Sequence, residues 1–320
     1  MQSTSLRKEQ SVTVVSELIL LGFSNLPQLW CLLFAVFLAA YVITLMGNIL
    51  IMLITTADPA LHSPMYFFLR NLSCLEICFI SVIVPKLLAN LLSANQTISF
   101  HGCILQMYFF FFFGSTECFL LAAMAYDRYV AICNPLRYTV VMNRRICIQL
   151  AVTSWVSGIP VGTVQTAWLF SFPFCGPTEI NHFFCDSPPV LKLVCGDTYL
   201  FEMYAVTGTI VIVLFPFILI LVSYICIIST ILRIPSAEGR LKTFSTCSSH
   251  LMVVTLFYST AGLTYFRPKS SYSPDTKKLL SLSYTVFTPM LNPIIYSLRN
   301  KEVKGALRKM LGWQIYSRQL

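Results

Sequence analysis

The chain has 320 residues, of which 56% are hydrophobic and only 11% are charged. A soluble domain carries about a quarter charged residues, so this composition excludes a soluble globular protein and indicates a membrane-embedded one. The formal net charge of +9 could serve nucleic-acid binding. The basic residues, however, lie in short connections between apolar segments, where they set membrane topology. We therefore expect the lipid bilayer as a partner and no nucleic acid.

Seven apolar stretches are long enough to cross a bilayer, which takes about 20 helical residues each. We predict membrane-spanning helices over Trp30–Thr55, Met65–Leu92, Gly102–Ile132, Cys147–Phe170, Tyr199–Leu232, Phe244–Phe266 and Leu279–Leu298. The predicted fold class is an all-α membrane protein, a seven-transmembrane helix bundle. The bundle occupies residues 30–298 of a single domain, residues 1–320.

The two ends of the chain are expected on opposite sides of the membrane, because seven is an odd number of crossings. Most of the 22 lysine and arginine residues lie inside when residues 1–29 are extracellular and residues 299–320 cytoplasmic, which favours that orientation. Basic and apolar residues alternate at near-helical spacing over Lys301–Trp313. This pattern predicts a short amphipathic helix on the inner membrane surface, with a disordered basic tail as the alternative.

Four of the 12 cysteines are expected on the outer face. Cys103 begins the third span, and Cys175, Cys185 and Cys195 lie in the long loop Ser171–Asp197 before the fifth. An even number in an oxidising compartment indicates two disulfides, and four cysteines allow three pairings. A Cys103–Cys185 bridge would tie the loop across the bundle as a lid, and Cys175–Cys195 would then close a local loop. The spacing alone does not choose this pairing.

One sequon falls where glycosylation is geometrically accessible. Asn95-Gln96-Thr97 lies in the outer connection between the second and third spans, close to the membrane. A second sequon, at Asn71, lies on the inner side and should stay unmodified. Asn95 is therefore the candidate glycosylation site.

The third span ends in the run Met124–Cys133, M-A-Y-D-R-Y-V-A-I-C, which places Asp127 and Arg128 at membrane depth. Charges there are costly and usually mark function. Arginine cannot lose its proton, so Arg128 needs a carboxylate or water, and Asp127 is adjacent. From these residues alone, two interpretations stand: a conformational switch, or a helix-end charge that reaches for the interface.

The seventh predicted span contains Asn292-Pro293-Ile294-Ile295-Tyr296, and with D-R-Y in the third the chain resembles rhodopsin-like G-protein-coupled receptors. More narrowly, it resembles the olfactory receptors of vertebrates. The matching strings are L-G-F-S (21–24), G-N (47–48), P-M-Y-F-F-L (64–69), M-A-Y-D-R-Y-V-A-I-C (124–133), P-L-R-Y (135–138), S-Y (223–224), K-T-F-S-T-C-S-S-H (242–250) and P-M-L-N-P-I-I-Y-S-L-R-N (289–300). Members of the family usually carry a sequon in the N-terminal tail, which Met1–Leu20 lacks.

This resemblance implies an odorant receptor of the plasma membrane. Such a receptor binds small, mostly apolar volatile ligands and activates a stimulatory, olfactory-type heterotrimeric G protein to raise cyclic AMP. The resemblance also implies the pairings Cys103–Cys185 and Cys175–Cys195. It places the ligand pocket in the outer half, between the third, fifth, sixth and seventh helices. The implied lining is Phe110, Phe111, Gly114, Ser115, Gly208, Ile212, Tyr258, Ala261, Tyr265 and Thr285.

The resemblance further favours the switch interpretation, in which Arg128 is released to meet the G protein. The implied switch residues are Asp127, Arg128, Tyr129, Arg240, Lys242, Asn292, Pro293 and Tyr296. Many rhodopsin-like receptors clamp the arginine with an acid at the start of helix six. Here Arg240 and Lys242 fill that region and Glu238 is a weak substitute, so other contacts are expected to hold the resting state. Pro293 removes a backbone donor and kinks its helix.

Glu76 and Glu117 are acids at mid-depth of the second and third spans, with no basic neighbour in sequence. Buried acids without partners tend to be protonated or to bind a cation. The resemblance implies that they face one another near Asn48 and Asn292 as a sodium or proton site. Hydrogen bonding between two neutral acids is the alternative. No cofactor or metal beyond such a sodium ion is expected.

Other classes of protein are less compatible with the sequence. An enzyme is disfavoured, because the four histidines are scattered, no H-E-x-x-H is present, and Ser115 lacks a nearby base. A retinal protein would need a lysine midway along the seventh span, whereas Lys277 and Lys278 lie at its outer end. A transporter would show an inverted repeat, which we do not find. A rhodopsin-like receptor for a non-odour small molecule is the main alternative.

Overall fold

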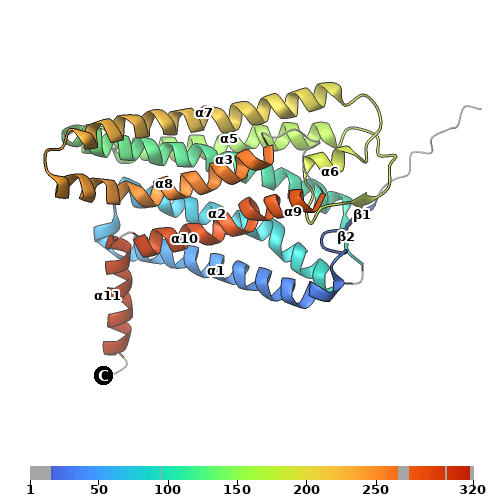
Figure 1. Ribbon diagram of the computed structural model, residues 1–320, viewed down its shortest axis with the longest axis horizontal. Coiled ribbons are helices and arrows are strands. Elements are labelled where there is room, and N and C mark those ends of the chain that lie inside the picture. Colours follow the sequence, from blue (N-terminus) through green and yellow to red (C-terminus); the bar gives the residue numbers. More distant parts are fainter. Residues whose placement is uncertain (1–15, 94, 266–273, 300, 318–320) are drawn as a thin grey trace, which may run out of the picture.

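The computed structural model describes residues 16–93, 95–265, 274–299 and 301–317, and this part of the chain is mostly helical. The long helices run side by side along the long axis of the molecule (Figure 1). They are α1 (Trp30–Ala57), α2 (Pro64–Leu92), α3 (Phe100–Cys133), α5 (Arg144–Leu169), α7 (Tyr199–Leu232) and α8 (Ala237–Tyr265). A further helix is interrupted: α9 (Pro274–Leu282) passes through a π-helical turn (Ser283–Phe287) into α10 (Thr288–Arg299).

Five helical segments of the described chain are long and apolar enough to cross a membrane. They are Pro27–Ala57, Pro64–Leu92, Phe100–Cys133, Arg144–Leu169 and Tyr199–Leu232, close to the first five predicted spans. The other two predicted spans are helical but differ from expectation. α8 begins at Ala237 rather than Phe244 and carries serine, threonine and histidine along its length, while the seventh stretch is divided by the π turn.

Helix α3 lies at the centre of the bundle and packs against α2, α5 and α7. Two glycines of α5 allow its backbone to approach α3 closely. A Cβ at Gly158 would overlap the carbonyl of Phe112, and one at Gly162 would lie 2.9 Å from the carbonyl of Tyr108. Small residues permit such close helix packing in membranes, where the hydrophobic effect does not drive helices together.

One end of the bundle is covered by a small sheet and a loop. The strands β1 (Glu17–Leu20), β2 (Thr97–Ser99) and β3 (Glu179–Ile180) form a sheet in the order β2-β1-β3. β1 pairs antiparallel with β2 and parallel with β3. We call residues 171–197, which include β3 and the short helix α6 (Ser187–Leu191), together with β1 and β2, the lid.

Two disulfides hold the lid. Cys103 at the start of α3 is bonded to Cys185, with 5.5 Å between their Cα atoms. Cys175 is bonded to Cys195, with 5.9 Å between their Cα atoms. The first attaches the lid to the central helix, and the second closes a loop within it. The structure thus contains the pairing that the family resemblance implied.

The opposite end carries α4 (Tyr138–Val141) and α11 (Lys301–Ser317). Helix α11 lies across the bundle axis, where an amphipathic helix was predicted (Figure 1). Its residues Val303 and Ala306 are buried against the bundle. The Tyr66 hydroxyl donates a 2.6 Å hydrogen bond to Glu302 Oε2, which fixes the start of α11 against α2. Short 3₁₀ turns at Pro27–Leu29, Pro59–Leu61 and Pro135–Arg137 complete the secondary structure.

Candidate functional site

A cavity of about 90 Å³ lies beneath the lid, lined by residues of α2, α3, α5, α7, α8 and the π turn. It contains seven of the ten lining residues implied by the resemblance: Phe110, Phe111, Gly114, Ser115, Gly208, Ile212 and Ala261. The other lining residues are Phe79, Glu117, Cys118, Val161, Gln165, Tyr204, Ala205, Thr209, Val213, Phe257 and Tyr284. Most of the expected lining residues therefore lie around one cavity, in the half of the bundle nearer the lid.

Two of the expected lining residues lie outside this cavity. The Tyr258 ring packs against Phe217 and Phe257, with centroid distances of 4.8 and 5.2 Å. Thr285 is fully buried, and its hydroxyl donates to the Ser281 carbonyl at 2.7 Å. The side chain of the one remaining expected lining residue, Tyr265, falls outside the described part of the chain.

The sequence did not predict the contribution of α5, which supplies Val161 and Gln165 to the cavity. α5 reaches the cavity because its glycines let it lie close to α3, and no hydrophobic pattern signals that approach. Tyr284 was also missed. It lies in the π turn, where the helical register changes, so its direction could not be read from regular helical spacing.

The walls of the cavity are mainly aromatic and aliphatic, with a few polar groups. Ser115 donates its hydroxyl hydrogen to the Phe111 carbonyl at 2.8 Å, and Thr209 donates to the Ala205 carbonyl at 2.7 Å. Their oxygens therefore face a ligand chiefly as acceptors. Gln165 Nε2 donates to Ser187 Oγ at 3.0 Å, which links the cavity wall to the lid. Apolar walls with few polar groups suit a small, mostly apolar ligand.

A cluster of buried polar groups lies at the predicted sodium or proton site. Asn292 Nδ2 donates to Glu76 Oε1 at 2.6 Å, and Glu117 is close enough to interact electrostatically with Glu76. Asn48 also interacts with Glu76, and its amide donates to the Thr44 carbonyl at 3.0 Å. In the described structure Glu76 Oε2, Glu117 Oε1 and Asn292 Oδ1 have no hydrogen-bond partner. Three such oxygens fit a hard cation or a bound proton.

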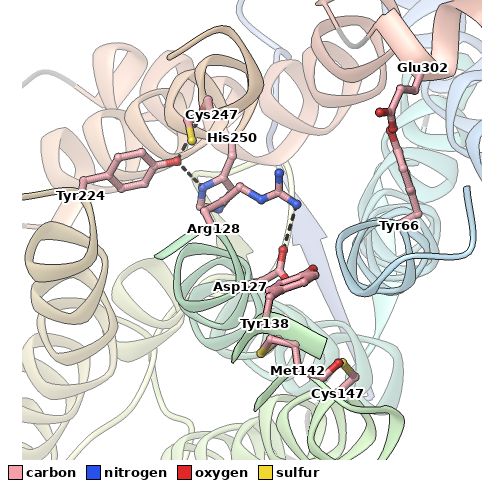
Figure 2. Close-up of polar contacts among 10 residues, drawn as sticks. All are labelled: Tyr66, Asp127, Arg128, Tyr138, Met142, Cys147, Tyr224, Cys247, His250 and Glu302. Atoms are coloured by element: carbon pink, nitrogen blue, oxygen red, sulfur yellow. Dashed lines mark hydrogen bonds and ion pairs between the residues drawn. The ribbon is translucent and has the colours of Figure 1, made fainter. Parts of the chain in front are cut away.

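Near the α11 end, Arg128 pairs with the acid beside it (Figure 2). Arg128 Nη2 lies 2.8 Å from Asp127 Oδ2, and the Tyr138 hydroxyl donates to Asp127 Oδ1 at 2.8 Å. Asp127 thus receives a hydrogen bond from a residue of α4 as well as the ion pair. Burial and the Asp127 carboxylate raise the pKa of the Tyr138 phenol, which stays protonated and donating.

The Arg128 guanidinium is 13% exposed and borders a small cavity with Asp127 and Tyr296. His250 of α8 lines the same cavity, and its Nδ1 lies 2.7 Å from the Tyr224 hydroxyl of α7 (Figure 2). Sequence reasoning did not pair Tyr224 with His250. Both lie within strings shared with the family, but their contact depends on how α7 and α8 are aligned.

The other predicted switch residues are distributed around this region. Asn292, Pro293 and Tyr296 are buried on α10, whereas Tyr129 is half-buried on α3. Arg240 is exposed and donates to the Ile234 carbonyl at 3.4 Å. The side chain of Lys242 lies outside the described part of the chain. Asn95, the candidate glycosylation site, is exposed at the lid end between α2 and β2.

Together, the long apolar helices indicate a multi-pass membrane protein, with a lidded cavity toward one end and a paired arginine toward the other. A family model described as "Olfactory receptor" matches residues 37–314. Human olfactory receptor 10A5 is 67% identical over 298 residues, which are 93% of this chain and 94% of that receptor. Human olfactory receptor 10A2 is 68% identical over 90% of this chain and 96% of its own length. The chain therefore belongs to the olfactory receptor family.

Proposed function

We propose that this protein is an odorant receptor that binds a small, mostly apolar volatile in the cavity beneath the lid. It activates a stimulatory heterotrimeric G protein and raises cyclic AMP. Membership of the olfactory receptor family carries this proposal, and the apolar lining of the cavity supports it. In the proposed topology seven helices cross the plasma membrane, the seventh being the interrupted α9–α10. The lid is extracellular and α11 is cytoplasmic.

The resting state is held by contacts at the cytoplasmic end. Asp127 holds Arg128, and Tyr224 holds His250, so α7 and α8 are joined next to the arginine. A ligand shifts this equilibrium only if it binds the open state more tightly than the resting state. Opening moves α8 outward and frees Arg128 to meet the G protein.

The surface offered to the G protein includes the loop 135–145 and the region of Arg240 and Lys242. Leu136 in that loop is 97% exposed and offers an apolar contact, with Arg137 beside it. An exposed leucine next to an arginine suits a partner with an apolar pocket and an acidic rim.

The test is cyclic AMP in cells that display the receptor, challenged with a panel of volatiles. We expect a dose-dependent rise that Arg128→Ala abolishes, because the substitution removes the group that meets the G protein. Lys304→Ala, an exposed residue of α11, serves as the control and should respond normally. A normal response of Arg128→Ala at equal surface expression would show that the switch assignment is wrong.

We also propose that Glu76, Glu117, Asn48 and Asn292 hold a sodium ion or a shared proton. The three buried oxygens without partners support this proposal. Replacing external sodium with an organic cation at constant ionic strength should shift the ligand concentration for half-maximal response. Glu117→Gln should remove that shift, since it removes one charge and keeps the shape. A wild-type response that ignores both sodium and pH would count against any such site.

The exposed Asn95 is the proposed glycan acceptor. We expect glycosidase treatment to lower the apparent mass of the wild-type chain and to leave Asn95→Gln unchanged. A glycan at this position would also place the lid end outside the cell, because glycosylation occurs only on the translocated side. An identical mass change in Asn95→Gln would assign the glycan elsewhere.

A further inference from the structure

Three segments that are far apart in the sequence are joined by hydrogen bonds at the lid end. Gly22 donates its N–H to the His182 carbonyl at 3.1 Å and accepts from Lys278 Nζ at 2.7 Å. His182 Nε2 in turn lies 3.2 Å from Ser281 Oγ. Lys278 and Ser281 lie on one face of α9, being three residues apart. These contacts form a closed circuit, which we call the lid clamp: Gly22, His182, Lys278 and Ser281.

The lid clamp is buried, so its polar groups must find their hydrogen-bond partners within the protein rather than in water. Lys278 is only 3% exposed, and His182 and Ser281 are equally shielded. A buried ammonium is costly unless it is hydrogen-bonded, and the Gly22 carbonyl supplies such a bond. Gly22 has a φ of +41°, in the left-handed region that favours glycine. The direction of its carbonyl therefore depends on the absence of a side chain.

The histidine of the lid clamp is neutral. Burial, and then the positive charge of Lys278, lower the pKa of His182 to about 3. Its Nδ1 faces the Phe184 N–H at 3.5 Å. A neutral ring that accepts at Nδ1 carries its hydrogen on Nε2. His182 therefore donates to Ser281, and this contact persists across the physiological pH range.

The segment around Gly22 is itself anchored to the bundle. The Phe23 ring lies 5.9 Å from the Phe183 ring and 5.8 Å from the Phe37 ring of α1, measured between centroids. Trp30 Nε1 donates to the Phe23 carbonyl at 3.1 Å. The N-terminal segment is thus fixed to α1 on one side and to the lid on the other.

The lid clamp joins α9 to the lid segment around His182, and both of these lead to the same wall of the ligand cavity. α9 continues directly into the π turn that carries Tyr284, which lines the cavity. The Tyr284 and Phe110 ring centroids are 6.1 Å apart, and those of Phe110 and Phe184 are 5.0 Å apart. Phe184 follows His182 by two residues. A change in the position of α9 relative to the lid would therefore move Tyr284 against Phe110.

We propose that the segment Leu21–Phe23 and Lys278 are positioning elements of the ligand site: through the lid clamp they set the place of Tyr284, and hence which ligands fit. The proposal rests on the proposed function only in treating the cavity as the ligand site. It extends the set of specificity-determining residues to groups that do not touch the ligand.

The first test needs no ligand. Hydrogen–deuterium exchange on the purified full-length chain should show faster exchange over residues 281–288 in Lys278→Met than in the wild type. Methionine keeps the length and apolar stem of lysine but removes the donor. Leu279→Met, which places the same residue at the exposed neighbouring position on α9, is the control and should exchange as the wild type does. Unchanged exchange in Lys278→Met would overturn the proposal whatever the receptor's ligand is.

The second test compares potencies over a series of active volatiles that differ by single methylenes. Lys278→Met should raise half-maximal concentrations about tenfold for some members and little for others, because a misfit of about one methylene in an apolar pocket changes binding by about tenfold or more. Gly22→Ala should shift the same members, and the double variant should be no worse than Lys278→Met alone. Uniform or additive effects would overturn the proposal.

Ser281→Ala repeats the comparison with a milder change if Lys278→Met fails to reach the cell surface. It removes one hydroxyl of the lid clamp and should shift the same members of the series in the same direction. An unaltered potency order in Ser281→Ala would overturn the proposal. Wild-type silence toward every volatile would instead count against the proposed function, and the exchange measurement would still decide the lid clamp.

Discussion

Asp186 and His182 are two buried titratable residues of the lid, and they have opposite effects on how the stability of the lid changes with pH. Burial raises the pKa of Asp186 to about 6, although the Ser187 N–H, which donates to it at 2.8 Å, works the other way. Its raised pKa makes the folded lid gain stability as the pH falls from about 6 toward 4. The lowered pKa of His182 does the reverse, because below about 6.5 the unfolded chain takes up a proton that the folded lid does not.

We therefore expect single substitutions to reveal a pH dependence that partly cancels in the wild type. In Asp186→Asn only the histidine effect remains, so the melting temperature should fall more between pH 7.5 and pH 5 than it does in the wild type. In His182→Gln the melting temperature should rise as the pH is lowered from 7.5 to 5, because only the aspartate effect remains of the two. Glu179→Gln, exposed on β3, is the control. If the wild type and the three variants showed parallel profiles of melting temperature against pH, the opposed effects of Asp186 and His182 would be disproved.

Residue chemistry alone predicted a pair only where the partners are neighbours in the chain, whereas the distant pairs Cys103–Cys185 and Glu76 with Asn292 followed from the family resemblance. The pair of Asp127 and Arg128 follows from adjacency. Tyr224 with His250, and Lys278 with Gly22, join residues that are 26 and 256 positions apart. Such contacts depend on helix register and on loop paths, which hydrophobic patterns do not encode. The sequence shows Lys278 only as a basic residue at the outer end of the seventh predicted span.

At the scale of elements, the hydrophobic runs predicted the first five long helices to within a few residues, because membrane crossing demands about 20 apolar residues. The same rule could not find the π turn, since one extra residue in a helical turn leaves composition unchanged. The strands of the lid contain only two to four residues. That is too short for an alternating pattern, and their partners lie far along the chain.

The close packing of α3 and α5 should depend on Gly158. A methyl group there would overlap the Phe112 carbonyl, so we expect Gly158→Ala to cost about 1–3 kcal/mol of stability, as overpacking does. Gly114 of α3 has open space around its Cβ position. Gly114→Ala should therefore be at least as stable as the wild type, given alanine's higher helix propensity, while altering ligand potency by narrowing the cavity.

Melting temperature and surface expression of the two glycine variants, measured side by side, would check this contrast. Equal losses in both variants would mean that glycine serves the helices generally rather than at one contact. Equal tolerance would mean that α5 can move away from α3 without cost.

At the scale of the whole molecule, the lid depends on its two disulfides to different degrees. Cys103–Cys185 closes 82 residues and joins fully buried sulfurs to the central helix, whereas Cys175–Cys195 closes only 20. Longer closures restrict the unfolded chain more, by about 1 kcal/mol for this difference. We expect the double serine variant of the first pair to lose more surface expression and thermal stability than that of the second. The reverse ranking would place the lid's main support in its local loop.

The central position of β1 has a consequence for biosynthesis. β1 is the first strand to leave the ribosome, yet its edges are covered by β2 and β3, which are made roughly 80 and 160 residues later. Its backbone groups therefore wait through four helix insertions before the sheet is complete. During that interval the receptor carries an open strand, the kind of surface that attracts chaperones or other nascent chains. Export of the receptor through the secretory pathway would then depend on how quickly α5 and the following loop, which carries β3, are synthesised.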